Sequence, residues 1–335
     1  MSSSLHGIID VSVIVPAYNE ARRISKCLDS LLRQDFDSFE VVVVDDGSVD
    51  GTSEVVKQYV MRYPGKVRLL RLRKNLGAGN ARNIGALYAR GKVITFLDAD
   101  MEFPSAFLST LVGPILKGLT HATCSGEEKI VNTDNPWVKV QAQRFKGMFS
   151  VERTGFVRAI LRELFLKFGG YDARFGYFDD QTLHLRTDIT AAVVKEAYLY
   201  HYNPDTAREV LWRNFWIGRS VLRAHKLIEV LIMAAKRLID ISPPAALLIL
   251  LTGHFLLQVV GAAILGAFVF AIVRHRVLEA GSVRGRLVLR LFYVPAYRFL
   301  RASGFIAGLL YSLAGRGFVH VGQVKVAELV TEFTG

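Results

Sequence analysis

Two aspartates, separated by a single residue, close an apolar stretch of the sequence. Asp98 and Asp100 follow residues 92–97, which end in Val-Ile-Thr-Phe-Leu. Carboxylate oxygens are ligands that Mg²⁺ and Mn²⁺ accept, and such an ion neutralises the charge of a bound diphosphate. An Asp-x-Asp pair alone is a weak signal, because it occurs in many loops by chance. Its place at the end of an apolar strand makes it a strong candidate for a metal site.

A second acidic pair follows another apolar stretch. Asp45 and Asp46 come directly after residues 40–44, which read Glu-Val-Val-Val-Val. A carboxylate here can accept a hydrogen bond from a nucleobase ring N–H or from a ribose. The alternative is a helix cap, a role that Ser48 or Asp50 can also take. One aspartate suffices for a cap, so the pair indicates an additional role in binding.

Residues 74–85 are rich in glycine and carry basic side chains. They do not follow the first strand and lack the G-x-G-x-x-G spacing of a dinucleotide loop. Their small residues would let a helix N-terminus approach a ligand closely. Arg82 can bind a phosphate through its forked guanidinium, and its pairing with a nearby aspartate is the alternative.

A third acidic pair, Asp179-Asp180, follows the turn Gly-Gly-Tyr-Asp at 169–172. Adjacent carboxylates rarely both serve packing. One of them can act as a general base that removes a proton from a hydroxyl. The other would orient it or cap the following helix.

The elements that position these residues alternate between strand and helix. We expect strands at 11–15, 40–44, 67–72 and 92–97, and helices at 20–34, 52–62 and 80–90. This repeat predicts a parallel sheet with right-handed crossovers, and ligands bind beyond the carboxyl ends of such strands. Residues 16–20, Asp45-Asp46 and 98–100 should therefore converge on one crevice.

After residue 120 the alternating pattern loosens. We expect strands at 121–131 and 191–201 and a short helix at 179–188, while 156–168 fits either a strand or a helix. The two cysteines, Cys27 and Cys124, lie in no metal-binding or disulfide pattern.

Charge and hydropathy separate the C-terminal part from the rest. The chain has 335 residues, a net charge of +12 and 51% hydrophobic residues, which is high for a purely soluble enzyme. Four basic residues share one helical face, with Trp212 and Trp216 close by; they are Arg208, Arg219, Arg223 and Lys226. This is typical of a helix at a membrane interface, and an ordinary solvated helix is the alternative. The basic residues lie on no nucleic-acid motif, so we expect no nucleic-acid partner.

The stretch 241–273 contains no Asp, Glu, Lys or Arg and exceeds the length of about 20 residues that a bilayer span requires. We therefore predict a membrane segment here. Arginines follow this stretch, and a single crossing from the cytoplasm would place them on the far side, against the positive-inside tendency. A re-entrant hairpin that bends near Gly261 is therefore the alternative. The apolar pattern of residues 302–315 predicts an interfacial helix or a second span. Before this stretch, one helical face carries Arg290, Arg298 and Arg301. No signal peptide is recognisable, which places the N-terminal domain on the cytoplasmic face.

Five motifs, in order, resemble the family 2 glycosyltransferases of the GT-A fold. They are VSVIVPAYNE at 11–20, VDDGS at 44–48, ARNIG at 81–85, FLDAD at 96–100 and GGYD…FDD at 169–180. The resemblance covers about residues 10–220. It implies a mostly parallel α/β sheet flanked by helices, a UDP-, GDP- or dTDP-linked sugar donor, and Mg²⁺ or Mn²⁺.

The resemblance also implies roles for individual residues. The nucleotide pocket would be lined by Pro16, Tyr18, Glu20, Asp45 and Asp46. Arg82 and Asp98 would contact the ribose or the diphosphate, and Asp100 would bind the metal, with Asp98 as a shared ligand. Asp180 would be the catalytic base of an inverting transfer, beside Asp179, where the family usually has Glu. His201 resembles a histidine that some relatives place near the metal, although a lone histidine is as often structural.

Two departures narrow the expected activity. The chain lacks the Q-x-x-R-W motif of processive synthases. It keeps the Asp180-type base, which polyprenyl-phosphate mannose synthases usually lack because their acceptor is already a phosphate. We therefore expect transfer to a hydroxyl of a lipid-linked or membrane glycan acceptor. A polyprenyl-phosphate sugar synthase and a non-catalytic module that binds nucleotide-sugar or lipid are the alternatives.

These observations predict a layout in four parts. A GT-A catalytic domain spans 10–205, with a nucleotide-binding half at 10–101 and an acceptor half at 102–205. Amphipathic interfacial helices follow at 206–240, and a transmembrane or re-entrant segment at 241–273. A basic tail with a second membrane-associated helix occupies 274–335, in contact with membrane lipids.

Overall fold

The chain folds into two compact units. The computed structural model describes residues 9–141, 156–187, 189–251, 254–273, 287–315 and 330–334. One unit, here the catalytic unit, comprises residues 1–131, 150–202 and 318–335; the other, the helical unit, comprises 132–149 and 203–317. The arginines predicted to follow the apolar stretch at 274–286 lie outside the described residues. The predicted boundary near residue 205 agrees with the end of β8, but each unit is assembled from separate parts of the chain.

The catalytic unit is built on one nine-stranded sheet, ordered β5-β8-β6-β7-β4-β1-β2-β3-β9. The predicted parallel strands are present as β1 (Val11–Ala17), β2 (Phe39–Asp45), β3 (Val67–Leu72) and β4 (Val93–Phe96). The remaining strands are β5 (Met101–Glu102), β6 (Ala122–Ile130), β7 (Ala159–Leu161), β8 (Ala192–His201) and β9 (Val330–Thr334).

The sheet is mixed rather than mostly parallel, which corrects the sequence prediction. β7 runs antiparallel to both β4 and β6, β5 runs antiparallel to β8, and β9 runs antiparallel to β3. β6 and β8 are again parallel, so both kinds of pairing occur beyond β4.

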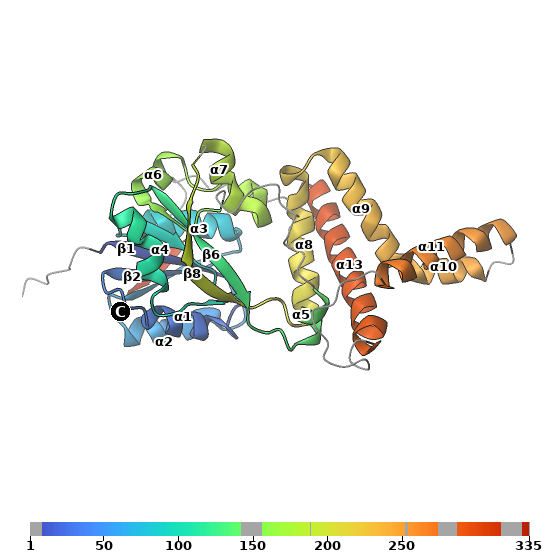
Figure 1. Ribbon diagram of the computed structural model, residues 1–335, viewed down its shortest axis with the longest axis horizontal. Helices are drawn as coiled ribbons and strands as arrows, with labels where there is room; N and C mark the ends of the chain where they lie inside the picture. The colour runs from blue at the N-terminus through green and yellow to red at the C-terminus, as the bar shows by residue number, and fades with distance from the viewer. Residues whose placement is uncertain are drawn as a thin grey trace, which may run out of the picture. The chain divides into compact units, whose positions relative to one another are not determined.

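Helices cover both faces of this sheet (Figure 1). One core layer joins α1 (Ile24–Leu32), α2 (Thr52–Arg62) and α4 (Phe107–Leu116) to alternate residues of β1, such as Val13 and Val15. The opposite layer joins α3 (Ala78–Tyr88) and α6 (Arg162–Lys167) to Ile14. Because β1 and β2 are buried on both faces, they read as continuous apolar runs.

The segment 156–168, whose sequence fits either a strand or a helix, contains both, because β7 leads directly into α6. The helix expected at 179–188 is also divided: η2 (Ala173–Gln181) carries the acidic pair, and α7 (Thr182–Thr187) follows.

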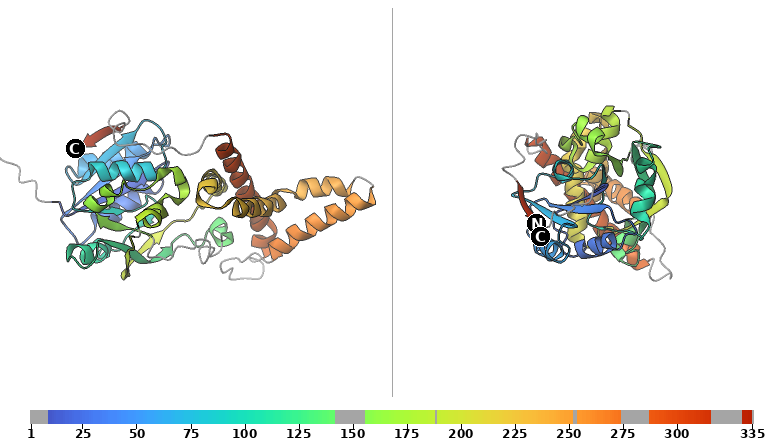
Figure 2. Two further views of the ribbon diagram at one scale, coloured as in Figure 1. Left: turned by 90° about the horizontal axis from the view of Figure 1, so that it is seen from above. Right: turned by 90° about the vertical axis from the view of Figure 1, so that its left-hand side faces the viewer.

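The last strand, β9, corrects the prediction of a separate basic tail over 274–335. It lies at the edge of the sheet beside β3 (Figure 2). Arg68 of β3, which is buried, pairs with Glu40 at 2.9 Å and with Glu332 of β9 at 2.5 Å. A single arginine therefore ties the end of the chain to the second strand of the sheet.

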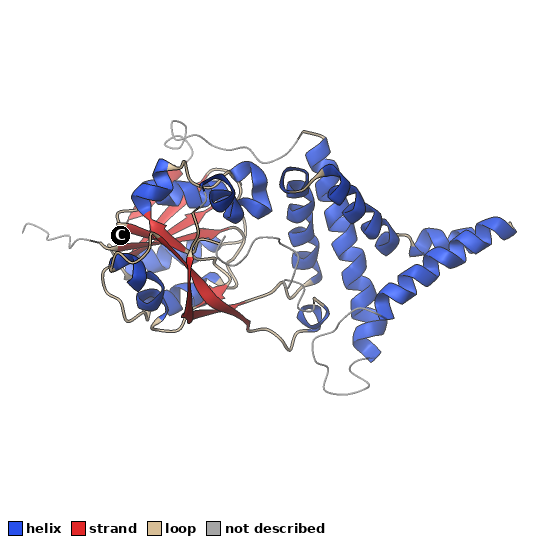
Figure 3. Ribbon diagram, turned by 45° about the horizontal axis from the view of Figure 1, so that its top comes forward, coloured by secondary structure: helices blue, strands red, loops and turns tan. Residues whose placement is uncertain are grey.

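The described part of the helical unit contains no strand (Figure 3). Its elements are α5 (Pro136–Val140), α8 (Ala207–Ala224), α9 (Leu227–Ile241), α10 (Pro243–Leu250), α11 (Phe255–Val273), η3 (Leu289–Tyr293) and α13 (Val294–Leu313).

The apolar stretch 241–273 is not a single span. It is shared between α10 and α11, and within the described ranges no helix is both long and apolar enough to cross a bilayer. The hairpin alternative put a bend near Gly261, but α10 ends at Leu250 and α11 begins at Phe255. Gly261 lies inside α11, where a Cβ would approach the backbone oxygen of Ala246 to 3.0 Å, so it allows α10 and α11 to pack closely.

The arginines of α13 do not form an exposed basic face. Asp240 of α9 is fully buried, and it pairs with both Arg298 and Arg301. Arg301 itself is only 3% exposed. These residues join α9 to α13 instead of facing a membrane surface, which corrects the sequence interpretation of this pair.

Helices α8 and α13 pack through glycines. A Cβ on Gly308 would lie 2.0 Å from the backbone oxygen of Phe215, and one on Gly304 would lie 2.3 Å from that of Leu211. The four-residue spacing of these glycines places both on one face of α13, so the two backbones approach closely.

Gly308→Ala is expected to destabilise the protein by about 1–3 kcal/mol, because the added methyl group has no space and the helices must separate. Gly266→Ala in α11 is the matched control, since nothing lies within 4 Å of its added Cβ. Thermal unfolding of both variants and the wild type measures the effect. An unchanged melting temperature for Gly308→Ala would contradict the close packing.

Candidate active site

The carboxyl ends of the central strands meet, as the sequence predicts. Ala17 is paired with Asp45 across β1 and β2, and the backbone N–H of Asp46 donates to the oxygen of Ala17 at 2.8 Å. On the other side, the N–H of Leu97 at the end of β4 donates to Ile14 at 3.1 Å. The segments carrying 16–20, 45–46 and 98–100 therefore leave the sheet at one edge.

Asp46 holds the glycine-rich loop in place. Its two carboxylate oxygens accept hydrogen bonds from the N–H groups of Leu76 (2.7 Å) and Gly77 (2.8 Å). Burial raises the pKa of Asp46 to about 7, although these two N–H groups act in the opposite direction. Gly47 has a φ of +75°, and a Cβ there would lie 2.7 Å from the backbone of Lys74, so only glycine allows this approach.

Asp45 is fully buried and fixes its own turn. Its side chain accepts hydrogen bonds from the N–H of Ser48 at 2.8 Å and from the hydroxyl of Ser53. Neither aspartate of the pair caps a helix, and it is Asp50 that accepts a hydrogen bond from the N–H of Thr52, the first residue of α2, at 3.1 Å. The contact of the acidic pair with a nucleobase or ribose stays a prediction.

The first motif contributes residues of different exposure. Pro16 is buried in β1, Glu20 lies 3.6 Å from Arg23, and Tyr18 is 37% exposed. Asn19, which the sequence interpretation did not single out, has a left-handed φ of 58°. Its N–H donates to Ser48 at 2.9 Å, and its side chain accepts from the N–H of Val49 at 3.0 Å, so it joins the first loop to the second.

Arg82 joins two of the acidic pairs. From α3, one guanidinium nitrogen donates to Asp98 at 2.7 Å and another donates to Asp179 at 2.8 Å. The pairing with an aspartate, which the sequence left as the alternative to phosphate binding, is therefore present and involves two. The contact of Arg82 with a ribose or a diphosphate stays a prediction. Burial lowers the pKa of Arg82, but Asp98 and Asp179 outweigh this effect and raise it above its ordinary value.

The two aspartates at 179–180 differ in exposure. Asp179 is 2% exposed; one oxygen receives Arg82, and the other has no hydrogen-bond partner among the described residues. Asp180 is half-buried. Burial raises the pKa of Asp179 to about 7 and that of Asp180 to about 6, in both cases against the effect of Arg82. Asp180 is therefore the more accessible of two carboxyls that titrate near neutral pH.

Asp100 and His201 come together on paired strands. Met101 of β5 is opposite His201 of β8, and the Nε2 of His201 lies 3.2 Å from Oδ2 of Asp100. Burial lowers the pKa of His201, but Asp100 and Glu128 outweigh it and raise the value to about 9. His201 and Asp100 are therefore neighbours, and the binding of a metal by either residue stays a prediction.

Two further charged residues lie in the cluster around Asp98, Asp100 and His201, and the sequence analysis did not single them out. Arg158, just before β7, lies 3.7 Å from Asp98 and 2.5 Å from Glu128 of β6. Glu128 lies 3.8 Å from Nδ1 of His201. Burial raises the pKa of Glu128, but Arg158 outweighs it and lowers the net value. No local motif marks either residue, because the sheet order brings β6, β7 and β8 together.

The donor atoms fit a divalent ion that is shared with a ligand. Among the residues that the structure describes, no three His, Cys, Asp or Glu side chains form a metal-binding group on their own. Asp100 and His201 nevertheless present one carboxylate and one imidazole side by side. Mg²⁺ and Mn²⁺ are often held by one or two protein ligands together with substrate phosphates. Asp98, predicted as a shared ligand, lies between Arg82 and Arg158 instead.

Comparison with known proteins agrees with this geometry. Residues 12–178, about half of the chain, match the family described as Glycosyl transferase family 2. The chain contains a family 2 glycosyltransferase domain. Asp98 and Asp100 lie within the matched residues of this glycosyltransferase domain, and the acidic pair Asp179-Asp180 begins one residue beyond them.

The relatives of the glycosyltransferase domain include several curated proteins. The uncharacterized glycosyltransferase YibD of Escherichia coli is 34% identical over 137 residues, which are 41% of this chain and 39% of that protein. A dolichyl-phosphate beta-glucosyltransferase of Dictyostelium discoideum is 41% identical over 101 residues, which are 28% of this chain and 31% of that protein. The matched stretch therefore spans well under half of these relatives.

A solved structure supports the GT-A fold of the glycosyltransferase domain. The mannosyltransferase PcManGT from Pyrobaculum calidifontis, in complex with GDP-Man and Mn²⁺, has a TM-score of 0.51 and 23% identity. The similarity covers 91% of this chain and 87% of that one.

Gly79→Ala is expected to reduce the transfer rate about 10–100-fold, because a Cβ there would lie 2.5 Å from Oδ2 of Asp179 and would displace the carboxyl from Arg82. The measurement is release of free nucleoside diphosphate from a panel of nucleotide-sugars in the presence of membrane extract. Gly113→Ala in α4 is the control, since nothing lies within 4 Å of its Cβ. Equal rates for the two variants would show that the position of Asp179 is unimportant.

Proposed function

We propose that the protein is an inverting glycosyltransferase. It would transfer a sugar from a UDP-, GDP- or dTDP-sugar to a hydroxyl of a lipid-linked or membrane-bound acceptor. The observation that carries this proposal is the double contact of Arg82. Through it, Asp98 at the end of β4 and Asp179, the neighbour of the candidate base, share one guanidinium.

In this proposal, Asp180 is the general base. Its carboxylate removes the proton from the acceptor hydroxyl while the hydroxyl oxygen attacks the anomeric carbon. The bond from that carbon to the donor phosphate oxygen breaks, and the electron pair leaves with the nucleoside diphosphate. A base with a pKa of about 6 is suited to this step, because it is ionised near neutral pH and retains basicity.

The leaving diphosphate needs positive charge. A divalent ion held by Asp100 and His201 would neutralise the charge that develops on it. Arg82 and Arg158 are two cations of the chain that lie beside Asp98 in the same cluster. Mn²⁺ accompanies GDP-Man in the Pyrobaculum structure, which supports a divalent ion without deciding between Mg²⁺ and Mn²⁺.

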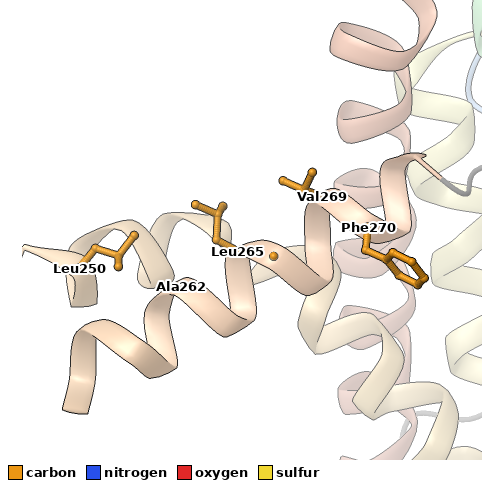
Figure 4. A pocket seen from close by; sticks show the side chains of 6 residues that line it. Leu250, Ala262, Leu265, Val269 and Phe270 are labelled. Carbon is orange, nitrogen blue, oxygen red and sulfur yellow. The ribbon is translucent and has the colours of Figure 1, made fainter. Parts of the chain in front are cut away.

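We also propose that the helical unit binds a membrane, with the catalytic unit on the cytoplasmic face. Support comes from apolar side chains exposed on α9, which are Leu227, Ile228, Leu231, Ile232 and Leu238. On α11, Phe255 and Phe270 are also exposed. An open recess lined only by apolar side chains and glycine lies along α11, with Leu250 of α10 at one end and Leu265 and Val269 of α11 beside it (Figure 4). Apolar surface of this extent is typical of contact with lipid or another protein.

A polyprenyl-phosphate sugar synthase is the second candidate. Two observations bear on it, in opposite directions. Relatives of the domain include dolichyl-phosphate beta-glucosyltransferases, whose acceptor is a phosphate. A phosphate acceptor needs no base, however, and the presence of Asp180, which is half-buried, therefore supports a hydroxyl acceptor. A non-catalytic binding module is disfavoured, because Asp98, Asp100 and Asp180 are all present.

Asp180→Asn is expected to reduce the transfer rate by a factor of about 10²–10⁴ while donor binding persists, because an amide cannot accept the proton. The assay is sugar transfer to an intact acceptor in membrane extract, with donor binding measured by calorimetry. Asp37→Asn is the matched control, since this aspartate is exposed and precedes β2 at the opposite edge of the sheet. Full activity of Asp180→Asn would reject the base and favour the phosphate acceptor.

The pH dependence of kcat/KM provides a second test. The active base is ionised, and its pKa is raised, so activity is present above the pKa and is lost as pH falls through it. We expect activity to fall between about pH 7 and about pH 6. Because Asp179 and Asp180 interact, this transition reflects protonation of the two carboxyls together and not of one alone. The residual activity of Asp180→Asn should lack the lower part of this transition. A profile that is flat down to pH 5 would contradict the proposal.

A further inference from the structure

A row of alternating charges crosses the catalytic unit. It begins at Arg82 and continues through Asp98 (2.7 Å), Arg158 (3.7 Å) and Glu128 (2.5 Å). It then reaches His201 at 3.8 Å from Glu128. None of the motifs of the sequence accounts for Glu128 or Arg158, and the mechanism above gives Glu128 no role.

The two oxygens of Glu128 have different partners. Oε1 receives the guanidinium of Arg158, while Oε2 faces Nδ1 of His201. Arg158 thereby holds the carboxylate from one side and leaves the other oxygen directed at the imidazole. At 3.8 Å this second contact is an ion pair and is longer than a hydrogen bond.

The two nitrogens of His201 also have different partners. Nε2 lies beside Asp100 at 3.2 Å, and Nδ1 lies on the side of Glu128. A histidine that binds a metal through one nitrogen usually donates the N–H of the other to a carboxylate, which fixes the ring and the tautomer. Glu128 stands where that carboxylate belongs.

We propose that Glu128 is a positioning residue that orients His201 for a divalent metal ion, with Arg158 anchoring the carboxylate. This inference rests on the proposed assignment of Asp100 and His201 to the metal. It does not require that the ion contact Glu128. It predicts instead that Glu128 acts on metal affinity only through the imidazole.

The strand β6 provides a matched control. Glu127 is the preceding residue, but its side chain is 61% exposed and lies 3.9 Å from Lys129. Glu127→Gln and Glu128→Gln therefore make the same chemical change on neighbouring residues, and only the second residue contacts His201.

The experiment is titration of the full-length protein with Mn²⁺ alone, followed by the loss of the EPR signal of the free ion. Glu128→Gln is expected to weaken binding about 10–100-fold, as loss of such partners does in other metal sites. Glu127→Gln should bind as the wild type does. Thermal unfolding of each variant verifies that it is folded.

A double-mutant cycle separates positioning from direct ligation. His201→Ala alone should weaken Mn²⁺ binding, and adding Glu128→Gln to it should cause no further loss, because Glu128 acts through the removed ring. A further loss of the full Glu128→Gln effect would overturn the proposal and make Glu128 a ligand itself. Wild-type affinity in Glu128→Gln would also overturn it.

The same measurements distinguish failure of the positioning role from failure of the proposed transferase function. A wild-type protein that binds Mn²⁺ and loses affinity in Glu128→Gln, but transfers no sugar from any donor, would keep the positioning role and reject the transferase. A wild-type protein that binds no Mn²⁺ would reject the positioning role and the metal assignment, whether or not it transfers sugar.

Discussion

The architecture of the site depends on one buried guanidinium. Arg82 lies between Asp98 and Asp179, which are far apart in the sequence and belong to different parts of the catalytic unit. Asp179 is buried and Asp98 is partly exposed, and removing carboxylates from water is costly unless positive charge and hydrogen bonds accompany them. Arg82 supplies both, and its planar fork fixes the directions of the two contacts. A lysine would supply the charge without the two-sided geometry.

The loops around this contact are held by a second set of interactions that use the backbone. Asp46 accepts two N–H groups from the loop that precedes α3, and Asn19 joins the first loop to the second. The aspartates of the β2 motif are therefore engaged within the fold itself. A ligand at this edge of the sheet would meet loops whose positions are already determined by hydrogen bonds, which lowers the entropic cost of binding.

Much of this could be predicted from the sequence, for physical reasons that can be named. The continuous apolar runs of β1 and β2 identify strands buried on both faces, and the acidic pairs mark where they end. The proximity of Asp100 and His201 followed from family resemblance. The contacts of Glu128 and Arg158 could not be predicted, because they depend on the order of strands after β4, where the pattern of the first half is lost.

The helical unit was harder to interpret, because hydropathy alone does not distinguish lipid contact from helix packing. The stretch 241–273 has the composition of a membrane span, yet it is divided between α10 and α11. Arg298 and Arg301 were assigned to a basic surface, but a buried aspartate on another helix binds them. Composition could not identify Asp240 as their partner, since it lies in a different helix, about sixty residues earlier.

The position of β9 makes residues 203–317, the larger part of the helical unit, an insertion within the catalytic fold. The chain leaves the sheet after β8 and returns to pair β9 with β3, where Arg68 binds Glu332. The helices are therefore tethered at both ends to one sheet, as a guest domain is within its host. Cutting the chain after β8 to isolate the catalytic part would leave β3 as an unprotected edge strand and Arg68 without one of its two carboxylates. A linker in place of the helices would preserve the sheet better than a truncation, but it must cross most of the sheet, because β8 and β9 lie near opposite edges.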